Sequence, residues 1–138
     1  MSDAVAVDRL RSIPLFAGLD EAALERLLDE CAEIEAPAGH VLVQAREPGS
    51  GLYVVVDGTV AVEYRDTSIE LGPGEFFGEL SLLVDDAPRS ARVRTVTPVL
   101  CLAIGRAEFE ELLENEPTVA LTMLRTLARR FVAEIDRP

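Results

Sequence analysis

Residues 72–91 gather glycines, prolines and polar side chains of the kinds that surround an anionic ligand. Gly78 lets the backbone approach a ligand closely because it carries no Cβ. The amides from Gly78 to Ser81 would open a short buried helical turn, and unpaired amides at such a start favour an anion. Arg89 carries a planar guanidinium that matches two oxygens of a phosphodiester, and Ser90 adds a hydroxyl donor beside it. These groups predict a phosphate site.

Glu79 lies in the same segment and extends this prediction from a bare anion to a sugar phosphate. A carboxylate next to an anion is repulsive unless another group engages it, and an ionised glutamate only accepts hydrogen bonds. Ribose hydroxyls would donate such bonds. The alternative is a structural ion pair between Glu79 and Arg89 beneath the loop, with no ligand involved.

Residues 77–82 and 88–91 resemble the phosphate-binding cassette of the cyclic-nucleotide-binding domain family, which includes the catabolite activator protein and the regulatory subunit of protein kinase A. The resemblance covers nearly the whole chain, and the segment after Pro117 is similar to the family's hinge helix. It implies that Arg89 pairs with the cyclic phosphate and Glu79 holds the ribose 2′-hydroxyl. The full set of ligand-binding residues that it implies is Gly78, Glu79, Leu80, Ser81, Arg89, Ser90 and Ala91.

The sequence departs from the family's pattern at two places. The family's Pro-Gly-Asp turn is replaced by residues 48–51, Pro-Gly-Ser-Gly, which lack the acid. Late in the hinge helix, Glu134 and Ile135 occupy the positions where close relatives place a threonine or serine that reaches the adenine. Arg130 and Glu134 are the candidate base contacts here, and the preferred base stays open between cAMP and cGMP.

The elements expected to position this segment are a helix, a series of short strands and two further helices. Many short strands with turns between them predict a mainly β fold: an antiparallel β-roll of the double-stranded β-helix or jelly-roll kind, with N-terminal helices and a C-terminal hinge helix. The expected helices are 20–32, 107–115 and 117–136, with an apolar turn at 13–16. The expected strands are 40–44, 52–56, 59–64, 68–71, 91–96 and 99–104. Asp57-Gly58 further predicts a tight hairpin between two of these strands.

We expect a single domain over residues 1–138. It divides into an N-terminal helical segment at 1–32, a β-roll at 33–104 containing the cassette at 72–91, and C-terminal helices at 105–138.

The last helix carries an apolar stripe with the spacing of a coiled coil. The stripe consists of Leu121, Leu124, Ala128, Phe131 and Ile135, at successive spacings of 3, 4, 3 and 4 residues. Such a seam predicts a homodimer through this helix. The alternative is that the helix packs its stripe on its own roll.

Composition excludes several other classes. The net charge is −12, so nonspecific binding of nucleic acid by this chain alone is not expected. All 13 basic residues are arginine, which excludes a Walker phosphate loop and Schiff-base chemistry because both need lysine. His40 has no second histidine with which to hold a metal. No apolar run is long enough to span a membrane and no signal peptide is recognisable, so a cytoplasmic protein with no membrane partner is expected. Cys31 and Cys101 read as reduced, buried thiols.

The sequence therefore predicts a module that senses cAMP or a close relative and has no catalytic machinery or cofactor of its own. The nucleotide would enter between the cassette and the hinge helix, whose repositioning would pass the signal to an effector protein that the sequence does not identify. Two alternatives stay open. One is a degenerate roll that serves only as a scaffold or dimerisation module, and the other is the ligand domain of a transcription regulator without its DNA-binding part.

Overall fold

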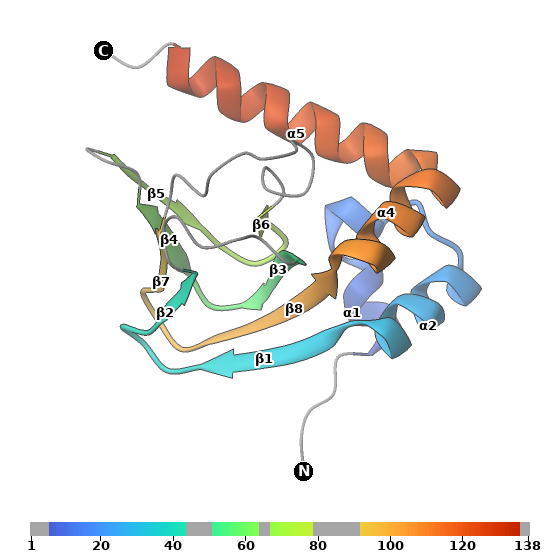
Figure 1. Ribbon diagram of the computed structural model, residues 1–138, viewed down its shortest axis with the longest axis horizontal. Helices are drawn as coiled ribbons and strands as arrows, with labels where there is room; N and C mark the ends of the chain where they lie inside the picture. Colours follow the sequence, from blue (N-terminus) through green and yellow to red (C-terminus); the bar gives the residue numbers. More distant parts are fainter. Residues whose placement is uncertain (1–5, 44–50, 64–66, 79–91, 136–138) are drawn as a thin grey trace.

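The computed structural model describes residues 6–43, 51–63, 67–78 and 92–135. The helices are α1 (Val7–Arg11), the 3-10 helix η1 (Pro14–Phe16), α2 (Glu21–Glu30), α4 (Arg106–Asn115) and α5 (Pro117–Ile135). The strands are β1 (Ala32–Ala36), β2 (Val41–Val43), β3 (Gly51–Asp57), β4 (Val60–Glu63), β5 (Ser68–Leu71), β6 (Phe76–Phe77), β7 (Arg92–Thr95) and β8 (Val99–Gly105). Figure 1 shows α1, α2 and α4 gathered at one end of the strands, with α5 running from that end over the sheets.

The strands form two antiparallel sheets of four strands each. Sheet A has the order β1-β8-β3-β6 and sheet B the order β2-β7-β4-β5. Among the described strands, only β4 and β5 are both consecutive in the chain and paired with each other. At each of the other connections along the chain, the next described strand lies in the opposite sheet, and this alternation makes the fold a roll. The predicted antiparallel β-roll with flanking helices is thereby confirmed.

The central strands of sheet A, β3 and β8, are largely buried on both faces, which explains the nearly continuous apolar sequence of β3. Successive side chains of a strand point to opposite faces of its sheet. Leu52 and Val54 therefore face the helices, whereas Val55 faces the interior of the roll, and all three are fully buried. Sheet A thus separates two hydrophobic clusters, one on the helix side and one between the sheets.

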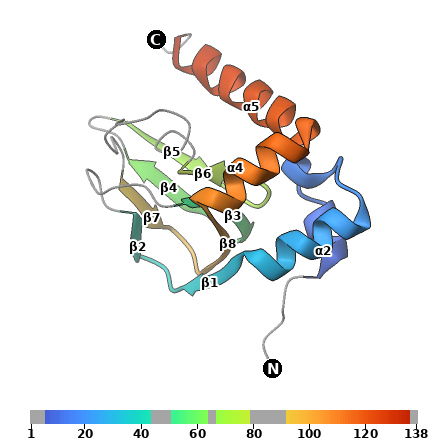
Figure 2. The ribbon, with the colours of Figure 1, turned by 45° about the vertical axis from the view of Figure 1, so that its right-hand side comes forward.

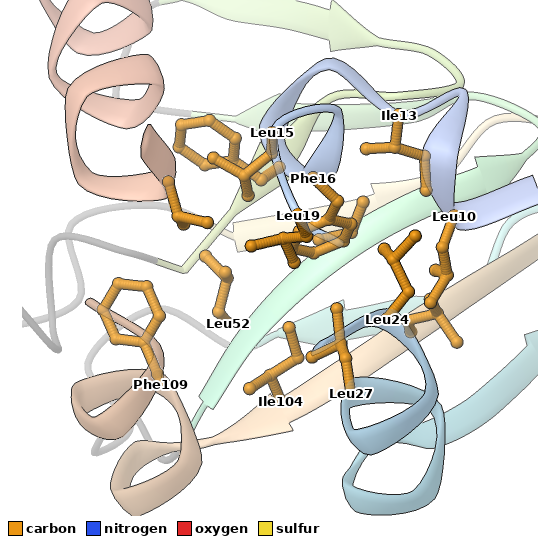
Figure 3. Packing of buried hydrophobic residues seen from close by; sticks show 14 of the residues in the cluster. Leu10, Ile13, Leu15, Phe16, Leu19, Leu24, Leu27, Leu52, Ile104 and Phe109 are labelled. Carbon is orange, nitrogen blue, oxygen red and sulfur yellow. The ribbon is translucent and has the colours of Figure 1, made fainter. Parts of the chain in front are cut away.

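The helix-side cluster joins every helical element to sheet A. Figure 3 shows side chains from α1, η1, α2 and α4 converging on Leu52 of β3 and Ile104 of β8. Phe16 and Phe109 are the largest of these side chains and are essentially inaccessible to solvent. Burying one such side chain stabilises the fold by about 1.5–3 kcal/mol relative to leaving it exposed. The predicted apolar turn at residues 13–16 is part of this cluster.

Helix α2 begins where the sequence predicts. The Asp20 carboxylate accepts a hydrogen bond from the Ala23 amide at 2.8 Å, which satisfies one of the unpaired donors of the first turn. Leu24 and Leu27 are buried and Leu28 is partly buried against the same cluster. The chain then leaves the helix at Cys31 and enters β1 directly.

The corner between β1 and β2 is fastened to β7 by a buried threonine. The Thr95 hydroxyl donates to the Pro37 carbonyl at 2.6 Å and accepts from the His40 amide at 2.7 Å. The Thr95 backbone adds two further bonds, because its carbonyl accepts from the Gly39 amide and its amide donates to the His40 carbonyl, both at 2.8 Å. This threonine satisfies the polar backbone of a corner that has left both sheets.

The predicted hairpin at Asp57-Gly58 is wrong. The strands on either side of it belong to different sheets, since β3 pairs with β6 and β8 whereas β4 pairs with β5 and β7. Gly58 does adopt the positive φ of 91° that favours glycine, but the turn is a sheet-to-sheet corner pressed against the Pro98 carbonyl. The Asp57 carboxylate forms an ion pair with Arg9 of α1.

Three elements had no predicted range of their own: α1, which lies in the expected N-terminal helical segment, β1, which opens the expected β-roll, and the two-residue β6. The other strands lie at the predicted positions wherever their residues are described. The expected buried turn at residues 80–84 lies outside the described residues.

Helix α5 buries one side of its first half and exposes its apolar stripe. Val119 and Met123 are buried in the helix-side cluster. The stripe faces solvent, with Leu124, Phe131 and Ile135 exposed at 64%, 67% and 61%. The stripe itself therefore does not pack on the roll in this conformation, although the helix does pack on its own chain through Val119 and Met123. No helix in the described ranges combines the length and apolarity required to cross a membrane.

Candidate functional site

Gly78 is the one residue of the predicted phosphate-binding set that the structure describes. Glu79, Leu80, Ser81, Arg89, Ser90 and Ala91 lie outside the described residues. Gly78 follows β6 directly and has a φ of 93°, a conformation that residues with a side chain rarely adopt. A Cβ at this position would lie 2.8 Å from the Gly51 carbonyl oxygen and 3.5 Å from the Tyr53 ring. Both the backbone angle and the space therefore require glycine where the candidate segment begins.

Strand β6 fixes the start of this segment by sending two aromatic rings in opposite directions. Phe76 joins the helix-side cluster, whereas Phe77 points into the cluster between the sheets. The Phe77 ring stacks on that of Tyr53, with centroids 5.0 Å apart and planes 5° from parallel. From the sequence, these three aromatic residues are predicted to belong to the core. The two phenylalanines are buried, which confirms the prediction for them, whereas Tyr53 is only partly buried.

The far end of the segment is fixed at Arg92, the first residue of β7. Its guanidinium contacts the Glu63 carboxylate of the neighbouring β4 at 2.8 Å, and Arg94 contacts the same carboxylate at 3.5 Å. The hydrogen bond from Arg92 lowers the pKa of Glu63, and the positive charges of both arginines act in the same direction. Because β6 is in sheet A and β7 in sheet B, Gly78 and Arg92 lie next to strands of different sheets.

The two candidate base contacts lie one turn apart near the end of α5. Arg130 is partly buried and reaches β6, where its Nη2 donates to the Phe76 carbonyl at 2.7 Å. The same guanidinium lies over the Phe76 ring, 4.5 Å from its centroid. From the sequence, the adjacent pair Arg129-Arg130 is predicted to be a solvated helix face. Arg129 is exposed, as expected, whereas the expectation is wrong for the partly buried Arg130. Glu134 is exposed one turn further on.

A groove of about 340 Å³ runs between α5, η1 and the turn that precedes β6. Its walls combine the apolar side chains of Leu15 and Phe76 with the polar ones of Thr126 and Arg129. The Arg129 guanidinium donates to the Thr126 hydroxyl at 3.3 Å within this wall. The groove therefore lies beside α5, next to the element that leads into the candidate segment.

Neither cysteine has the environment of a nucleophile. Burial raises the pKa of the Cys101 thiol to about 11, and burial also raises that of the half-buried Cys31. Both thiols are therefore protonated near neutral pH, whereas the thiolate is the reactive form. Among the described residues there is also no cluster of three or more histidine, cysteine or acidic side chains that could hold a metal ion.

Sequence reasoning missed the contact between Arg130 and Phe76, which are 54 residues apart. The sequence indicates that Phe76 and Phe77 belong to the core. It does not indicate that they form an edge strand, and only that assignment would have predicted a backbone carbonyl in need of a donor.

More than half of the chain matches a known protein family. The family model, described as the cyclic nucleotide-binding domain, matches residues 33–116, a range that includes the candidate segment and both of its fixed ends. A cyclic nucleotide-gated potassium channel from Rhizobium etli is 36% identical over 119 residues, covering 86% of this chain and 33% of the channel. A CRP-like cAMP-activated global transcriptional regulator from Mycobacterium tuberculosis is 30% identical over 123 residues, covering 85% of this chain and 54% of the regulator.

Among solved structures, the regulatory subunit of a cAMP-independent protein kinase A from Trypanosoma brucei superposes with a TM-score of 0.77 at 29% identity. That alignment covers 87% of this chain and 45% of the kinase subunit. The chain thus spans between a third and about half of the length of these relatives, which are a channel and regulatory proteins.

Proposed function

Because the chain belongs to the cyclic nucleotide-binding domain family, we propose that it is a sensor of cyclic nucleotides, with cAMP as its ligand. Arg89 would pair with the cyclic phosphate, and Glu79 would accept a hydrogen bond from the ribose 2′-hydroxyl. The remaining ligand contacts would come from Gly78, Leu80, Ser81, Ser90 and Ala91. The protein would act by binding alone, as a regulatory module in the cytoplasm that needs no cofactor.

The observation that carries this proposal is the conformation of Gly78 at the start of the segment. Its positive φ and its close approach to the Gly51 carbonyl leave room for no side chain. The family match runs through this glycine, and the sequence then supplies the acid, the hydroxyls and the guanidinium expected of a site for a cyclised ribose phosphate. In a chain with a net charge of −12, an anion needs a local site of this kind.

The similarity to these relatives does not determine which base the ligand carries. The M. tuberculosis regulator is described as cAMP-activated, whereas the T. brucei kinase subunit is described as cAMP-independent. In this chain, Arg130 and Glu134 are the candidate base contacts on α5, and a carboxylate such as Glu134 could accept from an adenine amino group. We therefore propose cAMP over cGMP on this residue.

Calorimetry with cAMP and with cGMP tests the site and the base together. The native protein should bind cAMP more tightly, and Arg89→Ala should weaken binding by about 30-fold to several thousand-fold, because the phosphate loses a buried charge partner. Arg11→Ala is the matched control, since Arg11 is an exposed arginine paired only locally with Asp8. Equal affinity in the native protein and Arg89→Ala would remove this arginine from the mechanism.

The scaffold alternative makes the opposite prediction. A degenerate roll would show no rise in melting temperature with any cyclic nucleotide, whereas a sensor is stabilised by each ligand that binds its folded state. The transcription-regulator alternative is favoured by the similarity to the M. tuberculosis regulator and concerns what a longer protein would attach to this module.

The exposed stripe of α5 supports a homodimer as the means of passing the signal on. Its spacing of three and four residues is that of a helix that pairs with a second copy of itself, and a ligand that repositions α5 would change this pairing. Sedimentation of the native protein should show a dimer that Phe131→Glu dissociates. Ala133→Glu introduces the same negative charge outside the stripe and should leave the dimer intact. A native protein that stays monomeric at high concentration would contradict this part of the proposal.

A further inference from the structure

Helix α5 is attached to the rest of the molecule in two different ways along its length. Its first half is held by apolar burial, since Val119 and Met123 lie in the helix-side cluster. From Leu124 to Ile135 no residue is fully buried, although Leu127 packs on the cluster with part of its side chain exposed, and Figures 1 and 2 show this end of the helix extending away from α4 and over the strands. Apolar packing alone therefore does not fix the position of the second half.

Strand β6 offers a polar anchor beneath this half of the helix. It is an edge strand of sheet A. The Val55 amide donates to the Glu75 carbonyl at 2.8 Å, and paired residues of antiparallel strands alternate between bonded and non-bonded positions. At the next residue, Phe76, the carbonyl therefore points away from β3, toward the open edge of the sheet. A carbonyl in this position needs a donor from outside the sheet.

Arg130 supplies that donor and holds the same residue in a second way. Its Nη2 donates to the Phe76 carbonyl at 2.7 Å while its Cζ lies over the Phe76 ring, 4.5 Å from the centroid. Phe76 is 2% exposed, so the position of its ring is set by the surrounding cluster. A planar, permanently charged group is suited to making both contacts at once, which a lysine ammonium cannot reproduce.

We propose that Arg130 is a positioning residue that latches the second half of α5 to strand β6. Its role in sensing rests on the function proposed above. Two residues after Phe76 comes Gly78, where a Cβ would already lie 2.8 Å from the Gly51 carbonyl oxygen, so the chain has little room to move in that direction. A displacement of the chain at the ligand site is therefore transmitted into β6, through Arg130 into α5, and to the exposed Phe131 beside it. The latch acts on the strand and the helix and does not depend on which base is bound.

Hydrogen exchange of the nucleotide-free protein tests the latch without any ligand. In Arg130→Ala, the amides of the last two turns of α5 should exchange about tenfold faster or more, because a charge-assisted hydrogen bond and a ring contact are lost together. Arg130→Lys should recover only part of the protection. Arg129→Ala removes the neighbouring arginine and should leave exchange unchanged, as should the β3–β8 pairing in every variant. Unchanged exchange in Arg130→Ala would overturn the proposal.

A second measurement separates the latch from a base contact and from the proposed function. In the native protein, cAMP should alter the protection of the end of α5, and Arg130→Ala should lose this response even at cAMP concentrations that saturate the variant. The variant should lose affinity equally for cAMP and cGMP, whereas selective loss for one nucleotide would assign Arg130 to the base instead. If the native protein binds no cyclic nucleotide, the proposed function fails, and the exchange result for the nucleotide-free protein still decides whether the latch exists.

Discussion

The two faces of sheet A differ in the size of the side chains that cover them. The helix-side face packs against leucines, phenylalanines and a methionine drawn from separate helices, among them Phe16 and Phe109. The face toward the roll interior is covered mainly by valines from the sheets themselves, and Phe77 is its single buried aromatic residue in the described ranges. Among the described residues, the larger buried side chains therefore lie on the helix side of sheet A, and the ligand segment begins at β6, which contributes one ring to each face.

The largest effect should come from emptying the helix side. Phe16→Ala removes a fully buried ring and should lower the free energy of unfolding by about 3–5 kcal/mol in a denaturant titration. Val62→Ala, on the roll-interior side, should cost only about 2 kcal/mol because fewer buried carbons are lost. Equal losses in the two variants would contradict the contrast between the two faces.

A glycine pair measures how tightly the margin of the roll is built. Gly78→Ala should lower the free energy of unfolding by about 2–3 kcal/mol, because the new Cβ adds a clash with the Gly51 carbonyl to the strain of a positive φ. Gly39→Ala is the control, since Gly39 has a φ of 78° with no atom within 4 Å of the added carbon. It should cost about 1 kcal/mol, the strain alone. Thermal or chemical unfolding of both variants measures the difference in unfolding free energy. Equal losses would mean that the backbone at Gly51 shifts to accommodate the new Cβ.

The buried hydroxyl at the β1–β2 corner should have a smaller effect. Thr95→Val keeps the shape of the side chain but leaves the Pro37 carbonyl without its donor and the His40 amide without its acceptor. The expected loss of unfolding free energy is about 1–2 kcal/mol, measured by denaturant titration. Thr97→Val, at an exposed hydroxyl bonded to the Thr59 amide, should cost less. A larger loss of stability in Thr97→Val would contradict this prediction, because it would mean that the Thr97 hydroxyl contributes more than the buried Thr95 hydroxyl.

The smallest effect should be seen on the outer surface of sheet B. Arg92 holds the pKa of Glu63 below its ordinary value of 4.5, so the ionised carboxylate stabilises the folded state at pH values above the unfolded pKa. This contribution is lost as the pH falls through the lowered folded pKa. Unfolding followed below about pH 4.5 should show a slightly shallower loss of stability in Glu63→Gln than in the native protein. Identical acid profiles would show that the pair is fully screened.

The sequence could predict the elements whose patterns are local. The apolar strands at residues 52–56 and 99–104 and the capped helix after Asp20 all lie where their patterns place them. Strand β1 was missed because its alternating glutamates, typical of a charged sheet edge, resemble a loop. The hairpin at Asp57-Gly58 was predicted wrongly because an Asp-Gly pair indicates a turn with a positive φ but does not determine whether the strands on either side of it pair with each other.

The same distinction applies to the candidate site. The residue types in the sequence predict a site for a sugar phosphate, and Gly78 has the backbone geometry that such a site needs. The roles assigned to Glu79 and Arg89 remain predictions, since these residues lie outside the described ranges. The contact of Arg130 with Phe76 depends on which strand ends at a sheet edge, and that is a property of the topology and not of either residue.

The strand order also constrains how the protein can be made. The central strand β8 pairs with both β1 and β3, and β7 pairs with both β2 and β4. The partners that complete both sheets are therefore among the last strands to leave the ribosome, so the earlier strands must wait with unpaired edges until about residue 105 has been synthesised. Such long-range closure slows folding, and during this interval the nascent chain is most exposed to aggregation.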